Sequence, residues 1–110
     1  MANIINMIAG LYETFDFETI TVTDQVKKLT EATFTTTTAE GKVEKAKRAI
    51  LTIEGGQLRY RMDGGNPTSS VGHLLNPFDV LIIIGNQNML NFRAIRVSNT
   101  NSKISVSYEK

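Results

Sequence analysis

The sequence predicts an all-β protein: a single antiparallel β-sandwich of immunoglobulin-like architecture with little or no helix. β-Branched residues, which favour strands, are abundant, with 13 Thr, 11 Ile and 7 Val among 110 residues. The second half of the chain contains five short strand-like runs, spaced by about ten residues and separated by turn-forming residues. Residues 103–109 alternate cleanly between apolar and polar side chains, which is typical of a half-buried strand.

The whole chain, residues 1–110, has the length of one domain and buries enough surface for a core without covalent staples. It contains no cysteine, so disulfides and thiolate metal sites are excluded. Residues 1–12 are apolar without a clear period. Two interpretations stay open for them: an edge strand of the domain, or an extended N-terminal arm that docks on a neighbouring subunit.

Strand-forming residues recur along the chain, and short turn sequences lie between them. Gly55-Gly56 joins two such runs and predicts a β-hairpin. Residues 42–49 could form a helical turn, but a strand over 46–54 is favoured, and residues 34–38 are a strand or an extended loop. Residues 63–72 and 85–88 have turn composition. The expected strands are residues 15–23, 46–54, 57–62, 78–84, 91–98 and 103–109.

Alternation within these runs predicts which side chains face the core. The run 78–84 is apolar on both faces, so we expect a central strand that is covered on each side. In residues 103–109 the polar positions, including Glu109, are expected to point outward. The side chains expected to fill the core are Ile20, Val22, Ile53, Leu58, Tyr60, Val80, Ile82, Ile84, Ile104, Val106 and Tyr108.

Charged residues supply the candidate binding surface. Arg59 and Arg61 share one strand face, whereas Arg93 and Arg96 lie on opposite faces of theirs. Arginines within strands pair with carboxylates inside a fold or across an interface, and both readings are kept. The candidate interface residues are Arg59, Arg61, Asp63, Arg93 and Arg96. A second basic cluster, Lys42, Lys45, Lys47 and Arg48, is interpreted as a solvated face.

No residue pattern predicts catalysis, a metal or a cofactor. His73 is the single histidine and is interpreted as a structural residue hydrogen-bonded to a turn. Asp63 and Asp79 could be imagined as a carboxylate pair, but Asp63 lies where a turn favours a capping Asp. The paired glycines do not form a phosphate loop. We therefore expect a protein that is not an enzyme.

Charge and hydropathy limit the partners. The net charge of +1 lacks the basic excess of nucleic-acid-binding proteins. The longest apolar run, residues 80–84, is too short to span a membrane. Neither nucleic acid nor membrane is expected as a partner.

The segment RYRMDGGNPT, residues 59–68, resembles the "YTxDGxxPT" hairpin of immunoglobulin-like domains at the C-termini of chitobiases and related carbohydrate-active proteins. It covers about ten residues. This resemblance implies a sandwich with this turn, and suggests a carbohydrate-binding module as one function.

A longer series over residues 46–109 is similar to small structural proteins encoded among the head and tail genes of tailed bacteriophages. Those proteins share the order "ITVEG–IRYRxDGxxPTxxxGH–G–NFRAIR–xVxY", and the chain has ILTIEGGQLRYRMDGGNPTSSVGHLL followed by NFRAIR and ISVSY. One departure is Asn76-Pro77-Phe78-Asp79, where a Gly-Asp turn is more usual. The N-terminal third carries no match to this order.

This second resemblance implies a virion component made in the host cytoplasm, such as a capsid decoration or head–tail accessory protein. Its partners would be the major capsid protein or other virion proteins, with many copies or a homo-oligomer on each particle. The sequence therefore leaves two functions: a non-enzymatic virion structural protein and, as the alternative, a carbohydrate-binding module. Three tyrosines and no tryptophan offer few aromatic platforms for sugars, which counts against the second.

Overall fold

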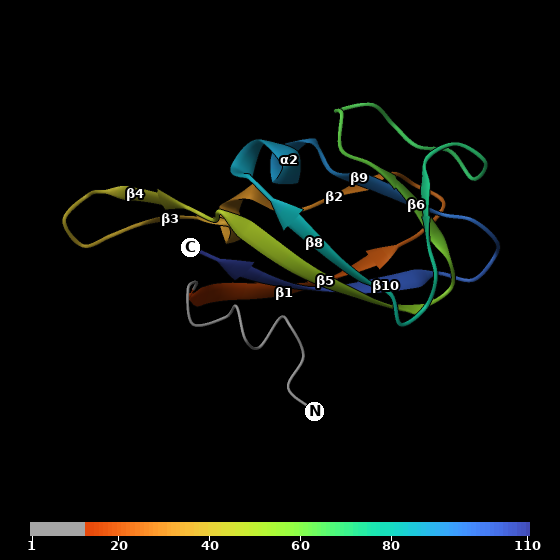
Figure 1. The fold of residues 1–110 in the computed structure, drawn as a ribbon, viewed down its shortest axis with the longest axis horizontal. Helices are drawn as coiled ribbons and strands as arrows, with labels where there is room; N and C mark the ends of the chain where they lie inside the picture. Colours follow the sequence, from red (N-terminus) through yellow and green to blue (C-terminus); the bar gives the residue numbers. More distant parts are fainter. Residues whose placement is uncertain (1–12) are drawn as a thin grey trace.

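The computed structural model describes residues 13–110 and shows a mostly β protein built of antiparallel sheets. Sheet A has the strand order β1-β10-β5-β8, sheet B the order β2-β9-β6-β7, and β3 and β4 form a separate two-stranded ribbon. Figure 1 shows the ribbon projecting from one end of the molecule. The strands are β1 (Thr14–Val22), β2 (Lys27–Lys28), β3 (Thr35–Thr37), β4 (Val43–Lys45), β5 (Arg48–Gly55), β6 (Leu58–Arg61), β7 (His73–Leu75), β8 (Val80–Ile84), β9 (Arg93–Arg96) and β10 (Ser102–Glu109).

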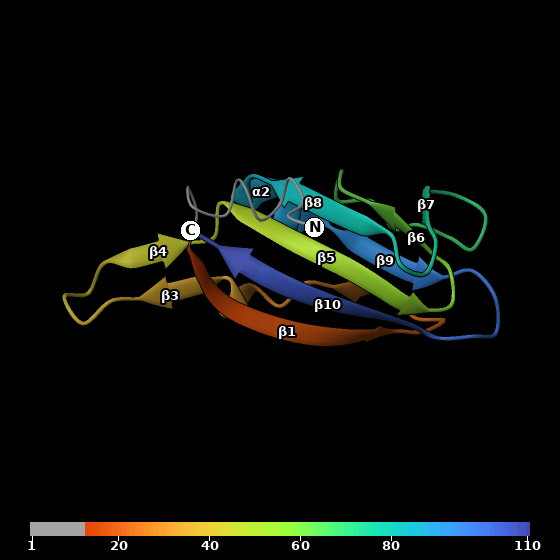
Figure 2. The same cartoon turned by 60° about the horizontal axis from the view of Figure 1, so that its bottom comes forward.

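Sheets A and B lie over each other and share one apolar core, so the architecture is a two-layer one (Figure 2). Ile53 and Val106 of sheet A are almost fully buried, as are Leu58 and Ala94 of sheet B. The aromatic rings of Phe34 and Tyr108, with centroids 5.3 Å apart, extend the core toward the ribbon. The interpretation as an all-β protein is confirmed at this level. The expected N-terminal arm, residues 1–12, lies outside the described residues.

The helical content is small but real. The 3-10 helix η2 (Glu31–Thr33) precedes β3, and the α-helix α2 (Asn86–Asn91) links β8 to β9. The expected turn over 85–88 is therefore the start of a helix, and the expected strand over 91–98 shortens to β9. Met89 is the buried residue of α2, so the helix closes one end of the core.

The predicted hairpin at Gly55-Gly56 is wrong. β5 belongs to sheet A and β6 to sheet B, so these glycines carry the chain from one layer to the other. Gly55 has φ +88°, a backbone region that L side chains rarely adopt. Gly56 donates its N–H to Asn101 O, and a Cβ on Gly56 would lie 2.4 Å from Thr100 O. The crossing therefore needs glycine because it passes close to the backbone before β10.

The predicted position and facing of β8 are also wrong. β8 pairs with β5 alone and ends sheet A, so it is an edge strand and not a central one. Val80 and Ile84 are 48 % and 67 % exposed, and Ile82 on the same face is half-buried. Ile83 is buried on the inner face. An apolar run can serve an edge strand as well as a buried one, and the sequence does not distinguish the two.

The inward facing of β1 and β10 is confirmed with one exception. Val22, Ile104, Val106 and Tyr108 are buried, and Ile20 packs against them. Glu109, expected outward, is buried with Arg48, which in turn had been assigned to a solvated basic face. The other members of that face, Lys42, Lys45 and Lys47, are exposed as expected.

Candidate functional site

Three of the predicted interface residues, Arg59, Arg61 and Asp63, lie on β6 and on the long loop that follows it. Tyr60 and Leu58 of β6 point into the core, so Arg59 and Arg61 necessarily project from the outer face of sheet B. Residues 62–72 return over this face before β7. The alternation of β6 therefore places both guanidinium groups on one face, as the sequence predicts, and the loop contacts them there.

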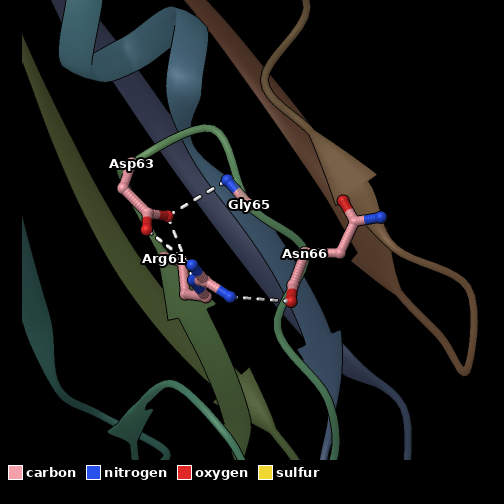
Figure 3. A network of polar contacts seen from close by, with 4 residues as sticks. All are labelled: Arg61, Asp63, Gly65 and Asn66. Atoms are coloured by element: carbon pink, nitrogen blue, oxygen red, sulfur yellow. Dashed lines mark hydrogen bonds and ion pairs between the residues drawn. The ribbon is translucent and has the colours of Figure 1, made fainter.

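Arg61 holds the first half of this loop through Asp63 (Figure 3). Its Nε donates to Asp63 Oδ1 at 3.0 Å and its Nη2 to Asp63 Oδ2 at 2.5 Å, which is a bidentate ion pair. Asp63 Oδ1 also accepts the N–H of Gly65 at 3.0 Å, and Arg61 Nη1 donates to Asn66 O at 3.3 Å. The expected role of Asp63 as a turn cap is confirmed.

The ion pair changes the acidity of the Asp63 carboxyl group. Hydrogen bonding from Arg61, and secondly from the Gly65 N–H, lowers the pKa of Asp63 from 3.8 to about 2. The same contact raises the pKa of Arg61. Asp63 is therefore ionised at neutral pH, when it would have to be protonated to serve as a general acid.

Arg59 holds the second half of the loop. Its Nε donates to Ser69 O at 3.1 Å and its Nη1 to Gly72 O at 2.9 Å. Thr68 adds a local turn, because its Oγ1 accepts the N–H of Val71 at 3.0 Å. Two arginines of one strand therefore fix a loop of eleven residues, numbers 62–72, by binding mainly its backbone.

Arg93 joins this face and Arg96 does not. Arg93 lies directly opposite Arg61 on neighbouring strands, whereas Arg96 lies opposite the inward-facing Leu58. Like charges at opposed positions repel each other. Here the pairing with Asp63 offsets the charge of Arg61, and Arg93 Nη1 donates to Leu90 O at 3.1 Å and Phe92 O at 3.3 Å. The expected opposite facing of Arg93 and Arg96 is confirmed.

Arg96 belongs to a different hollow at the end of sheet B. Its Nη1 donates to Asn101 Oδ1 at 2.6 Å. A groove of about 430 Å³ runs between residues 67–69 of the long loop and residues 95–99, with Asp24 at its margin. The site predicted as one set therefore divides into an arginine face, defined as Arg59, Arg61 and Arg93, and a separate groove at Arg96.

The contacts of His73 and Asp79 are of the kind that stabilises a fold. The His73 ring lies 5.1 Å from the Tyr60 ring, so its contact is aromatic and not the expected hydrogen bond to a turn. Asp79 Oδ2 accepts the N–H of Asn76 at 2.8 Å and caps that turn. A hollow of about 310 Å³ is lined by Arg61, Met62, Asp63 and His73. Asp79 is not among its lining residues, so no carboxylate pair faces that hollow.

A second surface was not predicted as a site. We define the β8 outer row as Phe78, Val80, Ile82 and Ile84, which share the outer face of sheet A at its β8 edge. Phe78 is 89 % exposed, more than any other large apolar side chain that the structure describes. The signal in the sequence is the uncharged apolar run 80–84, which predicts a doubly covered strand as readily as an exposed edge.

The described residues present two surface features, the arginine face and the β8 outer row. Within residues 13–110, no group of three or more His, Asp or Glu side chains is placed to hold a metal ion. No helix among these residues is long and apolar enough to cross a membrane. No protein-family model, curated protein or solved structure matches the chain. The arginine face, the β8 outer row and the sequence series over 46–109 are the features that bear on function.

Proposed function

We propose that the chain is a non-enzymatic structural protein of a tailed-bacteriophage virion, a capsid decoration or head–tail accessory protein with an immunoglobulin-like sandwich. The observation that carries the proposal is the ordered series of segments over residues 46–109. Its segments fall in β5, β6, the long loop, β9 and β10. The protein acts by binding the major capsid protein or other virion proteins in many copies.

The arginine face is the proposed docking surface for the virion partner. Each guanidinium has five N–H donors. Arg59 uses two of its nitrogens to bind the long loop, and Arg93 uses one nitrogen to bind the carbonyls of Leu90 and Phe92. The remaining donors suit carboxylates on an acidic partner surface. Because these backbone contacts hold the guanidinium groups in place, little side-chain entropy is lost on binding.

Display on a symmetric particle strengthens such a contact. A single docking event through a few exposed charges is weak and sensitive to salt. Copies that also contact one another on the particle gain effective concentration, which raises the overall affinity without new contacts to the capsid. Assembly follows synthesis in the host cytoplasm, and the virion is the proposed final location.

Quantitative mass spectrometry of gradient-purified virions tests the proposal. We expect the chain at a fixed ratio to the major capsid protein, and we expect Arg93→Glu to reduce that ratio while the protein remains folded. Lys103→Glu is the matched control, because Lys103 is an exposed cation on the opposite sheet. Absence of the wild-type chain from washed virions would refute the assignment.

The carbohydrate-binding alternative is favoured by the loop alone. Asp63, Asn66 and Thr68 of the resembling turn lie beside exposed surface, and the hollow at Arg61 and His73 is open to a polar ligand. Sugar sites need exposed aromatic faces, whereas Tyr60 and Tyr108 are buried. Binding on a glycan array that is lost in Asp63→Ala would support this function over the first.

A further inference from the structure

Sheets A and B have four edge strands, and they differ in how well they are protected against pairing with another chain. β2 and β7 are very short, at two and three residues. β1 carries Asp16 and Glu18 and has an irregular register between Thr14 and Asp16. Short length, charge and bulges are the devices that protect an edge. β8, with the sequence Val-Leu-Ile-Ile-Ile, has five residues and no charge or proline.

The hydrogen-bonding direction of β8 follows from its register with β5. Residues of an antiparallel pair alternate between those bonded to the neighbour and those facing away. Gly85 donates its N–H to Lys47 O, and the paired positions Ile83 and Leu81 continue this bonded series. The N–H and C=O groups of Val80, Ile82 and Ile84 therefore point away from β5, toward the edge of the sheet.

Phe78, immediately before this strand, is unfavourable for an isolated monomer on two counts. Its φ is +73°, and among the described residues it is the only non-glycine residue with a positive φ. A bulky residue held in that region is strained. Its ring is also 89 % exposed. Strain combined with an exposed aromatic side chain is typical of an interface anchor.

We propose that β8 is a self-association edge, through which two copies of this chain pair antiparallel across a two-fold axis at Ile82. In this register Val80 lies opposite Ile84 of the other copy, and Ile82 lies opposite Ile82. Ile84 O already accepts a hydrogen bond from Asn88 Nδ2 at 2.8 Å. The other outward-pointing N–H and C=O groups of the three residues therefore supply up to about four backbone hydrogen bonds between the copies. The two four-stranded sheets become one continuous sheet, with β8 strands at its centre.

A second copy is the occupant that best fits this edge. An isologous contact needs a self-complementary patch, and a strand with apolar side chains on both sides of Ile82 provides one. Asp79 would face Gly85 of the other copy, so no like charges meet. Phe78 lines a hollow on the outer face of sheet A with Thr52 and Ser105, so a second copy placed along β8 would cover its exposed ring from the side. A five-residue strand pair plus one ring is small for an interface, so the dimer should dissociate on dilution.

This inference does not depend on the virion assignment, because it concerns the purified chain by itself. Sedimentation equilibrium of the full chain from about 1 µM to about 1 mM tests it over the range expected for a weak dimer. We expect a reversible monomer–dimer equilibrium for the wild-type protein. Ile82→Lys, which adds the charge that protects natural edges, should weaken the association at least about tenfold.

Phe78→Gly provides the sharper variant. Glycine adopts φ +73° without steric strain, so the monomer should keep its melting temperature within a few degrees while association is lost. The matched control is Phe17→Lys, which changes another exposed apolar residue, 56 % exposed, on the opposite edge strand of the same sheet. It should leave the association constant unchanged.

Amide hydrogen exchange checks the register directly. The N–H groups of Val80, Ile82 and Ile84 should become more protected as the protein concentration rises, whereas those of Leu81 and Ile83 should be protected at every concentration. A wild-type chain that stays monomeric at every concentration overturns the proposal. The edge would then be left for another protein or for residues 1–12 of the same chain. Association that survives both Ile82→Lys and Phe78→Gly overturns it as well.

Discussion

Arg48 and Glu109 form a buried ion pair across sheet A. They lie directly opposite each other on β5 and β10, and Arg48 Nε and Nη2 both lie 2.5 Å from Glu109 Oε1. Both side chains are 4 % exposed. Lys47 donates its N–H to Glu109 O beside them, so the two strands are joined here by backbone and side-chain contacts together. The pair fixes the C-terminal end of β10 to the start of β5.

Removing one partner of this pair should destabilise the fold strongly. Glu109→Ala leaves the guanidinium of Arg48 buried without its carboxylate, and the expected loss is about 3–5 kcal/mol of unfolding free energy. Urea denaturation followed by circular dichroism measures it. Glu54→Ala is the control, because it breaks the exposed pair of Glu54 with Lys103 at 3.3 Å and should cost under about 1 kcal/mol. Equal losses in the two variants would contradict the assignment.

Tyr108 should make the fold sensitive to alkali. Burial, and secondly its hydrogen bond to Glu18 Oε2 at 2.5 Å, raise the pKa of Tyr108 well above 10.0. Because the folded pKa is higher than the unfolded one, this stabilisation is fully present below about pH 10 and is lost as the pH rises further, by up to about 1.4 kcal/mol per pH unit. The melting temperature should be measured between pH 8 and 11, roughly the range in which tyrosine titrates in the unfolded chain. Over this range it should fall less steeply for Tyr108→Phe than for the wild-type protein.

Two comparisons complete this test. Absorbance at alkaline pH should show that the phenolate of Tyr108 forms together with unfolding, and not before it. Tyr60 has a pKa that burial alone raises, so Tyr60→Phe should reduce the alkaline slope without removing a contact to Glu18. An identical slope in wild type and Tyr108→Phe would show that Tyr108 ionises in the folded protein.

Asp63 should make the long loop sensitive to acid. Its folded pKa of about 2 lies below the ordinary 3.8, so the stabilisation from Arg61 and Gly65 is present above about pH 4 and disappears as the pH falls toward 2. The carboxyl is exposed, so the global effect is small and is best followed locally. The carbon-13 chemical shift of the Asp63 carboxyl reports its pKa, which should rise toward 3.8 in Arg61→Gln. An unchanged midpoint would contradict the ion pair.

The loss of stability expected when Gly55 is replaced by alanine has two parts, backbone strain and steric contact. Gly55 and Gly41 have nearly the same φ, +88° and +84°, so alanine should cost about 1–2 kcal/mol at either position from left-handed strain. A Cβ at Gly55 would lie 2.6 Å from Asn101 O, whereas nothing lies within 4 Å of one at Gly41. Gly55→Ala should therefore lose a further 1–3 kcal/mol or so. Equal losses by urea denaturation would show that the crossing relaxes.

The strands that sequence predicted best are those with a regular alternation. β1 and β10 appear where the period of two placed them, with Ile104 and Val106 in the core. β8 has no alternation, since all five residues are apolar. The sequence therefore predicts the wrong residues of β8 to be buried. Whether Ile82 or Ile83 faces the core depends on the register of β8 with β5.

For the candidate site, alternation located Arg59 and Arg61 but not what they bind. Asp63 is two residues from Arg61 and could be recognised as a turn cap from local sequence. Ser69 and Gly72 bind Arg59 through their backbone carbonyl oxygens. Every residue has a carbonyl oxygen, so no side-chain pattern in the sequence could predict these two contacts. The partner of Arg48 lies 61 residues away, which is why it was interpreted as solvated.

The sequence by itself determined the all-β class, the approximate positions of most strands and the faces of those that alternate, because these follow from local propensity and the two-residue period of a strand. Tertiary structure decided which sheet each strand joins, that Gly55-Gly56 crosses between layers, that Arg48 and Glu109 meet, and that β8 ends its sheet. Those features depend on pairing between segments far apart in the chain, for which a local pattern carries no information.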